Sequence, residues 1–470
     1  MALNMHKTIR YGLILIMSFC FYICSDDTFS FAENTLDIQN LTILDLETAQ
    51  RIAIEKNPSI AAARERVLQA KERISQAKSA YWPQVDGSLA VSRVELSKNA
   101  EQNPFEGFGS SNGSFLSVES PEDYYNADLI ASWTLFDGFE RKFNVSAAKF
   151  QHQETRAAQN DAYRLLLSAV SQAYFNALLA RENIRIAEAD QAFNQRQLED
   201  AQARQRIGTG SLSDVLNFQV QINTARSAII TAKRSYRIAL YALAALLGQT
   251  DDFFESQVKP ADLSEETTEE LILPDMESMF RTAETHRPDL FQAEYTVNRT
   301  EQQIGATKAN FYPTVQLSGK LNSERTNSGR MSQDDFGNVV ALSVNYNLFS
   351  GGFYKARLNE AISNKKEAEK ILAGVIINTR AEVREALARL DSARNLLELQ
   401  RSNADLVKQN RDLVEKEYVA GQTSLVRLNE AQRDLISAQS RLALALVSLK
   451  QARQDLKAAT GEILIPFSTL

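Results

Sequence analysis

Residues 428–459 read LNEAQRDLISAQSRLALALVSLKQARQDLKAA, and leucine and alanine recur in this stretch at alternating steps of three and four residues. Residues 215–246 carry the same ten-position pattern, from Val215 and Phe218 to Leu243 and Leu246. An apolar period of 3.5 residues is typical of a left-handed coiled coil, and frequent alanine lets two backbones approach closely. An ordinary bundle core is the alternative, but ten unbroken positions in both stretches favour a sustained coiled coil.

The chain carries one internal repeat. The offset between matching motifs drops once, between Pro83 and Phe136, so the first repeat has the longer loop there. The matched motifs are Asn57-Pro58 with Arg287-Pro288, Tyr81-Trp82-Pro83 with Phe311-Tyr312-Pro313, Leu135-Phe136-Asp137-Gly138 with Leu348-Phe349-Ser350-Gly351, Gly208 with Gly421, and Gly248 with Gly461. We therefore divide the mature chain into a first repeat (33–248), an acidic, Thr-containing linker (249–273), a second repeat (274–461) and a short tail (462–470).

Each repeat changes its period along the chain. Apolar and polar residues alternate within 84–136 and 314–349, which predicts two β-hairpins with four strands of about ten residues each. Long helices are predicted at 139–207, 212–247, 353–419 and 425–460, and shorter ones at 44–56, 59–80, 276–286 and 289–311, with a proline interrupting each short pair. The predicted fold is therefore mostly α, with four strands per chain.

Residues 1–32 have the pattern of a secretory signal peptide. Two basic residues precede an apolar run at 12–24, and the small residues up to Ala32 predict cleavage after Ala32. A membrane anchor is the alternative, but the apolar run of 12–24 is short for a span. Cys20 and Cys24 would leave with the signal, and neither follows a small residue, so we predict no disulfide and no lipid-modified cysteine.

Composition and motifs argue against several functional classes. The net charge of -7, from 52 basic and 59 acidic residues, lacks the basic excess of a nucleic-acid binder. With three histidines and no mature cysteine, the chain offers no zinc-ligand spacing, and it contains no phosphate-binding loop. The sequence therefore predicts no cofactor, no metal, no nucleic-acid partner and no enzymatic activity.

The predicted strands and helices pose a problem that one chain cannot solve. Strands of about ten tilted residues are long enough to cross a bilayer. A sheet in lipid must close, and four strands are too few for a barrel with a lumen, because such barrels take about eight or more. Three chains would supply twelve strands, so we expect a shared barrel in an outer membrane, with the helices continuing as a tube.

The chain resembles the TolC-like outer membrane efflux proteins. The resemblance rests on the order and spacing of four features: the two repeats, the aromatic-Pro motifs before the hairpins, the Leu-Phe-x-Gly motifs after them and the Gly421-x-x-Ser-Leu turn. The resemblance covers about residues 42–461. It implies a homotrimer with a twelve-strand barrel in the outer membrane lipid of a two-membrane bacterium and a helical tunnel in the periplasm. It also implies passive export of drugs, small molecules or secreted proteins, with a periplasmic adaptor and an inner-membrane transporter of RND or ABC type as partners.

The resemblance also places the closing end of the tunnel. It puts the tips, which dock the adaptor, at the turns around Gly208, Gly210 and Gly421. The gate tyrosine falls on Tyr418 and its partners on Ser213 and Asp214. Two positions depart from the family pattern: Thr423 stands at the gate arginine, and Arg427 stands at one of the two acidic ring positions, while Glu430 holds the other, so the acidic double ring is not kept.

Two hypotheses from the sequence remain open. Asp214 and Arg427 are repeat-equivalent, so in a trimer they would alternate in a ring of six opposite charges; solvated tip charges are the alternative. Trp82 and Trp133 are candidates for membrane-interface anchors, with simple packing as the alternative. At the level of function, a periplasmic coiled-coil adaptor or structural protein without a barrel is the competing interpretation, which the two hairpins disfavour.

Overall fold

The computed structural model describes residues 43–95, 122–249, 259–267, 271–327, 329 and 332–467. These residues belong to one unit, Thr42–Leu470. The predicted signal peptide, most of the first hairpin loop and parts of the linker and tail lie outside the described residues.

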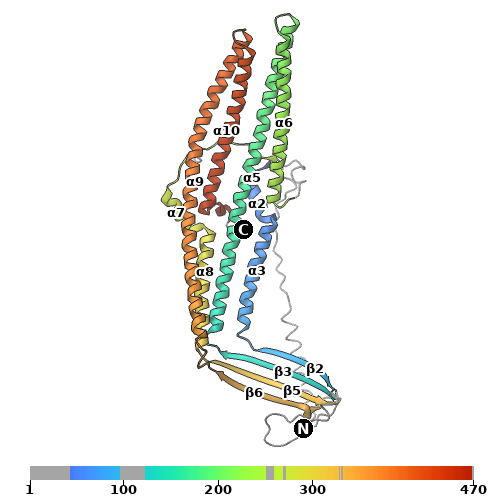
Figure 1. Ribbon diagram of the computed structural model, residues 1–470, viewed down its shortest axis with the longest axis vertical. Helices are drawn as coiled ribbons and strands as arrows, with labels where there is room; N and C mark the ends of the chain where they lie inside the picture. Colours follow the sequence, from blue (N-terminus) through green and yellow to red (C-terminus); the bar gives the residue numbers. More distant parts are fainter. Residues whose placement is uncertain are drawn as a thin grey trace. The chain divides into compact units, whose positions relative to one another are not determined.

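Four long helices dominate the described chain (Figure 1). They are α5 (Glu140–Arg206), α6 (Leu212–Leu246), α9 (Phe353–Val419) and α10 (Leu425–Thr460). Helices α5 and α9 each hold 67 residues, which corresponds to roughly 100 Å at about 1.5 Å per residue. No helix in the described ranges is both long enough and apolar enough to span a membrane.

Short helices flank the long ones and begin at clear sequence signals. They are α2 (Leu46–Lys56), α3 (Pro58–Ser79), α7 (Met276–His286) and α8 (Pro288–Lys308), which is followed by the short 3₁₀ helix η4 (Ala309–Phe311). The side chains of Asp45 and Asp275 cap the first turns of α2 and α7. Pro58 and Pro288 stand at the first helical position, where the missing N–H costs nothing. The prolines therefore open the second helix of each pair.

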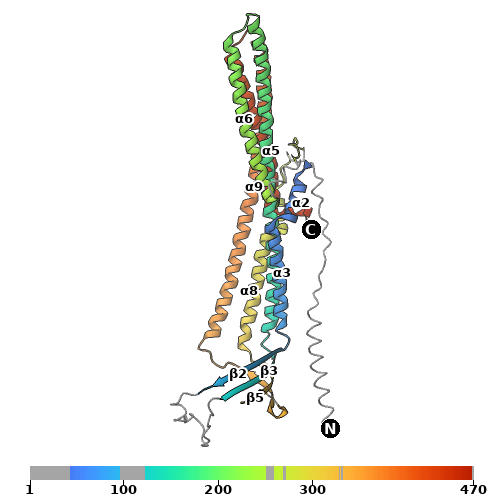
Figure 2. The ribbon, with the colours of Figure 1, turned by 90° about the vertical axis from the view of Figure 1, so that its right-hand side faces the viewer.

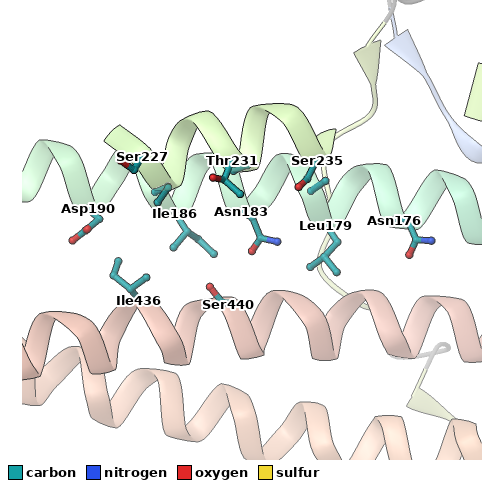
Figure 3. A pocket seen from close by; sticks show the side chains of 14 residues that line it. Asn176, Leu179, Asn183, Ile186, Asp190, Ser227, Thr231, Ser235, Ile436 and Ser440 are labelled. Atoms are coloured by element: carbon teal, nitrogen blue, oxygen red, sulfur yellow. The ribbon is translucent and has the colours of Figure 1, made fainter. Parts of the chain in front are cut away.

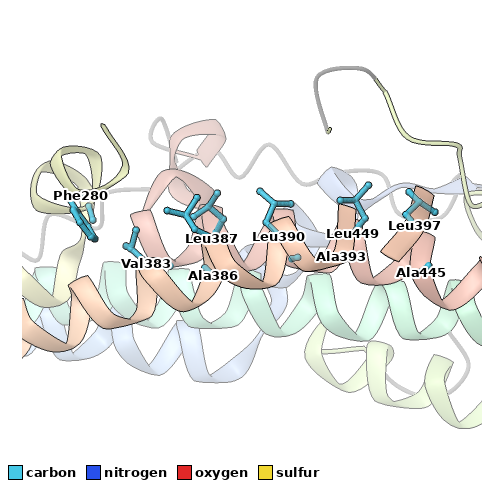
Figure 4. Packing of buried hydrophobic residues seen from close by; sticks show 13 residues of the cluster. Phe280, Val383, Ala386, Leu387, Leu390, Ala393, Leu397, Ala445 and Leu449 are labelled. Carbon is cyan, nitrogen blue, oxygen red and sulfur yellow. The ribbon is translucent and has the colours of Figure 1, made fainter. Parts of the chain in front are cut away.

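The apolar seam of α10 is buried as its period requires. Figure 4 shows its second half, which includes Ala445 and Leu449, in one cluster with Val383 and Leu390 of α9 and Phe280 of α7. The equivalent seam of α6 is buried at its two ends, from Val215 to Ile229 and again at 243–244, and half-buried in between. The two repeats thus use the same seam but bury it to different extents within one chain.

Four antiparallel strands lie at the end of the long helices opposite the helix–turn–helix tips (Figures 1 and 2). They are β2 (Gln84–Val94), β3 (Glu122–Phe136), β5 (Thr314–Thr326) and β6 (Phe336–Asn345), in the order β2-β3-β5-β6. The pairing of β3 with β5 joins the two repeats in one sheet. The second hairpin is shorter than its predicted range 314–349, because β6 ends at Asn345.

The two faces of this sheet differ in polarity. Register places one face's side chains in rows across all four strands, such as Val85, Ala131, Gly319 and Val340. Many of its apolar side chains have large exposed fractions, from 62% to 86%: Val85, Leu89, Val91, Val340, Leu342 and Val344. The opposite face carries polar and charged groups, including Lys320 Nζ at 3.1 Å from Asp128 Oδ1. One chain therefore leaves a large apolar surface uncovered.

The linker and the tail are more ordered than the sequence indicates. In the linker, β4 (Lys259–Pro260) pairs in parallel with β1 (Ile43–Leu44), and Arg181 donates to the carbonyl oxygens of Pro260 and Ala261 at 2.6 and 2.8 Å. In the tail, the 3₁₀ helix η6 (Glu462–Phe467) buries Ile463 and Phe467. The sequence predicts only a linker at 249–273 and a short tail at 462–470; in the structure, residues 259–261 and 462–467 of these segments contact the long helices.

Candidate functional site

Two tight turns form the tips of the helical hairpins (Figure 1). Gly208 and Gly421 have φ values of +76° and +75°, a conformation that residues with a Cβ rarely adopt. Ser211 and Ser424 cap the helices that follow, through their hydroxyl oxygens. At Gly210 the reason for glycine is space, because a Cβ there would lie 2.8 Å from Arg204 Cβ.

Below the turns, all four long helices share one apolar cluster. Helix α5 contributes Phe193, Leu198 and Ala201; α6 contributes Val215, Phe218 and Ile222; α9 contributes Val414 and Tyr418; and α10 contributes Leu428 and Ala431. The cluster mixes residues of both repeats. The two hairpin tips of one chain are therefore packed together.

Tyr418 is the polar centre of this cluster. Its side chain is buried, and its hydroxyl donates to Asp214 Oδ2 at 3.1 Å. Its ring centroid lies 6.4 Å from that of Phe218 in an edge-on arrangement, and the Arg204 guanidinium carbon lies 5.2 Å from the centroid, over the ring. Burial, together with the nearby Asp214 carboxylate, raises the pKa of Tyr418 to about 12. The phenol therefore stays protonated at neutral pH and acts as the donor.

Three further polar contacts join the two hairpins. Gln197 donates to Glu415 at 2.7 Å, Asn429 donates to Asn217 at 2.9 Å, and Gln432 donates to Asp190 at 2.8 Å. Burial raises the pKa of Asp190, although hydrogen bonds from Gln432 and Asn194 oppose this shift. The sequence analysis missed these pairs, because each joins helices from different repeats and no periodic pattern marks them.

The other predicted tip residues have different surroundings. Ser213 is exposed, and its N–H donates to Ser211 Oγ at 3.0 Å as part of the helix cap. Thr423 is half-buried in the second turn. Arg427 lies 3.8 Å from Glu430 on its own helix, and both side chains are about half exposed. Within one chain Arg427 faces Glu430 while Asp214 accepts from Tyr418, so the six-charge ring stays a prediction about the assembly.

A groove lies between α5, α6 and α10, further from the tips (Figure 3). Its volume is about 600 Å³, and Asp190 stands at one end. Ser227, Thr231 and Ser235 of α6 line it together with Asn183 of α5 and Ser440 of α10. The groove coincides with the half-buried stretch of the α6 seam.

At the other end of the helices, the predicted aromatic motifs mark the junction with the sheet. Trp133 Nε1 donates to the Tyr81 carbonyl oxygen at 3.0 Å, while Trp82 is 74% exposed. Arg141, which the sequence analysis did not single out, lies over the Tyr81 ring and pairs with Asp137 Oδ2 at 2.7 Å. It also donates to the carbonyl oxygens of Ala80, Thr134 and Leu135.

The two junctions differ in tightness. A Cβ on Gly138 would lie 2.7 Å from the Ala309 carbonyl oxygen, whereas one on Gly351 would meet open space. Both glycines have positive φ.

Aromatic side chains also gather at these junctions. In the second repeat, Phe311 packs edge-on against Tyr354, with the ring centroids 6.2 Å apart, and Phe349 is 88% exposed. The other motif residues of these junctions are Pro83, Phe136, Tyr312 and Pro313, of which Tyr312 is 54% exposed. Many aromatic rings therefore remain uncovered at the helix end of the sheet.

Comparison with known proteins gives a consistent result. The model of a family described as "Outer membrane efflux protein" matches residues 50–249 and 280–462. The outer membrane efflux protein BepC of Brucella suis is 24% identical over 417 residues, which are 88% of this chain and 82% of BepC. The alkaline protease secretion protein AprF of Pseudomonas aeruginosa is 27% identical over 361 residues, which are 72% of each chain.

A solved structure shows the same fold. The CmeC outer membrane channel of Campylobacter jejuni matches with a TM-score of 0.73 and 18% sequence identity, over 88% of this chain and 85% of CmeC. The two segments matched by the family model fall in the two predicted repeats, apart from Gln249 and Glu462 at their ends, and leave out residues 250–279.

Proposed function

Since the chain belongs to the outer membrane efflux protein family, we propose that it forms a trimeric channel-tunnel that exports substrates passively across the outer membrane. The single observation that carries this proposal is the sheet, which in the described part of one chain has an exposed apolar face and two unpaired edges. An edge in hydrocarbon would leave backbone groups unsatisfied. The competing adaptor function offers no role for such a sheet.

Strand directions support closure by three copies. Because β2 and β6 are the two edges of a four-stranded antiparallel sheet, they run in opposite directions. Strand β6 of one copy can therefore pair antiparallel with β2 of the next, and three copies give a closed barrel of twelve strands. The apolar face then contacts lipid and the face with Lys320 and Asp128 lines the lumen, as in other outer-membrane barrels.

The exposed aromatic residues support the same orientation. Trp82, Tyr312, Phe349 and Phe353 have exposed fractions between 54% and 88% and stand where the sheet meets the helices. Outer-membrane barrels carry aromatic girdles at the two membrane interfaces. The helices then continue into the periplasm, and the tips around Gly208 and Gly421 lie farthest from the membrane, where they would meet a periplasmic adaptor and an inner-membrane transporter.

At the tips, the Tyr418–Asp214 contact is the proposed gate. It is a hydrogen bond to a carboxylate that ties the second-repeat hairpin to the first. Such a bond contributes about 1.5–3 kcal/mol, with the lower end fitting a half-exposed acceptor. A trimer would contain three such bonds, one within each chain, and together they would hold the tips closed. The relatives BepC and AprF are named for efflux and for protease secretion, so small molecules and proteins are both candidate cargo.

Two measurements test the proposal in order. Detergent-extracted protein from the outer-membrane fraction should have the native mass of a trimer, and it should form channels in planar bilayers. A soluble periplasmic species or a monomer would overturn the barrel. In the channel recordings, Tyr418→Phe should raise conductance, because it removes the hydroxyl and keeps the ring. Unchanged conductance in both Arg427→Ala and Asp214→Ala would rule out the six-charge ring. Unchanged conductance in Asp214→Ala would also rule out the gate, because this change removes the acceptor of the Tyr418 hydroxyl.

A further inference from the structure

The hydrogen bond, the edge-on ring contact and the cation–π contact of Tyr418 all come from the hairpin of the first repeat. Arg204 lies in the last turn of α5, and Asp214 and Phe218 lie at the start of α6 on the other side of the turn. The tyrosine itself is the contribution of the second repeat. The first hairpin thus forms a socket with a cationic, an acidic and an aromatic wall.

The second hairpin has no such socket. At the offset that relates Gly208 to Gly421, the positions of Arg204, Asp214 and Phe218 hold Glu417, Arg427 and Ala431, and the position of Tyr418 holds Gln205. The cationic position is now acidic, the acidic position is cationic, the aromatic position holds alanine, and glutamine replaces the tyrosine. One chain therefore carries one socket, although its two hairpins are built alike.

Arg204 is held in place by the turn itself. Its carbonyl oxygen accepts hydrogen bonds from the N–H groups of Thr209 and Gly210 at 3.0 and 3.1 Å. The missing side chain of Gly210 leaves the space that the Arg204 stem occupies. The guanidinium then lies over the Tyr418 ring, which is the favoured position for a cation on an aromatic face.

We propose that Arg204 is the positioning residue of the tip gate, holding the Tyr418 ring so that its hydroxyl reaches Asp214. The inference rests on the proposed channel function and adds a residue to its gate. The competing explanation is a surface arginine that only complements the negative end of the α5 dipole. Arg206 shares that position at the helix end and is exposed, so it is the matched control.

The test compares Arg204→Met, Arg204→Lys, Arg206→Met and Tyr418→Phe in single-channel recordings of the purified trimer. Methionine keeps most of the stem and removes the charge, whereas lysine keeps the charge. Loss of a cation–π contact changes an equilibrium constant by about fivefold, or about 100-fold if three gates open together. We expect Arg204→Met to raise the ratio of open to closed time by more than this amount, because the hydrogen bond of Tyr418 to Asp214 weakens as well. Arg204→Lys should raise the ratio less, and Arg206→Met should leave it unchanged.

A double variant separates positioning from a general loss of packing. If Arg204 acts through the Tyr418 hydroxyl, Arg204→Met should have a smaller effect in the Tyr418→Phe background, where only its contact with the ring can be lost, whereas a loosened tip would add its full effect in both backgrounds. Equal effects of Met and Lys, an equal effect of Arg206→Met, or full additivity would overturn the role of Arg204. If Tyr418→Phe opens the channel but Arg204→Met does not, this inference fails and the gate stands. Absence of channels in wild type refutes the proposed function instead.

Discussion

Gly461 ends α10 in a left-handed conformation, with φ +81°, and packs directly against the end of α7. A Cβ added there would lie 2.6 Å from the His286 carbonyl oxygen. Gly421 has nearly the same φ, +75°, but a Cβ there would meet nothing within 4 Å. The substitutions Gly461→Ala and Gly421→Ala therefore share the backbone strain and differ only in the overlap.

The magnitudes follow from these two terms. Placing alanine in the left-handed region costs about 1–2 kcal/mol, which is the whole expected effect of Gly421→Ala. At Gly461 the approach of 2.6 Å must also be relieved, because ordinary contact begins at 3.4 Å. The segment cannot move freely, because Arg287 N donates to Ala283 O and its guanidinium donates to Ala459 O. Adding about 1–3 kcal/mol for overpacking gives roughly 2–5 kcal/mol for Gly461→Ala.

The assay is thermal unfolding of the detergent-solubilised protein, followed by far-UV circular dichroism at one scan rate. A fixed rate is needed because apparent midpoints of large proteins depend on it. We expect the midpoint of Gly461→Ala to fall about 1.5 to 4 times as far as that of Gly421→Ala, because the two variants share the strain and only Gly461→Ala adds the overlap. Gly248→Ala should behave like Gly461→Ala, because its Cβ would overlap the Lys56 carbonyl oxygen. Equal shifts for Gly461→Ala and Gly421→Ala would refute the close packing of the α10 end.

Two further predictions concern charged groups. Burial alone would raise the pKa of Asp289, but the hydrogen bonds and charge of Arg287 lower it below its ordinary value of 3.8. Its carboxylate therefore stabilises the fold above pH 3.8, and this stabilisation is lost as the pH falls through the lowered pKa. In thermal melts across a pH series, Asp289→Asn should reduce the fall of the melting midpoint at acidic pH. At the sheet junction, Arg141→Met should destabilise the protein by about 1.5–3 kcal/mol, because three carbonyl oxygens lose a charged donor. Lys142→Met, at the neighbouring position, should leave the melting midpoint unchanged, because its side chain is exposed and no hydrogen bond or ion pair in the described structure depends on it.

Local periodicity determined most of the fold. The 3.5-residue period predicted the helix at 425–460, and the proline-free stretch before it predicted the helix at 353–419; the structure places α10 and α9 at these bounds. Alternation likewise located the four strands, with the end of β6 as the main difference. Such features are readable because each depends on neighbours within one turn or one pleat.

The residues of the proposed gate could be predicted from the sequence only in part. The family resemblance pointed to Tyr418 and Asp214, whose side chains the structure joins by a hydrogen bond of 3.1 Å. Nothing in the sequence singled out Arg204 or the pairs Gln197–Glu415 and Gln432–Asp190. Polar contacts of this kind follow no period, because a single side chain on each helix suffices to make them.

The remaining features were decided by tertiary packing. Three contacts join segments that are far apart in the chain: β1 pairs with β4, η6 is buried against the helices, and the Arg287 guanidinium donates to the Ala459 carbonyl oxygen of α10. Their residues look like ordinary linker, tail and helix-start residues until the helices bring them together. The sequence thus determined the elements and their order, whose physical cause is local, whereas the choice of partners across the bundle depended on how those elements pack.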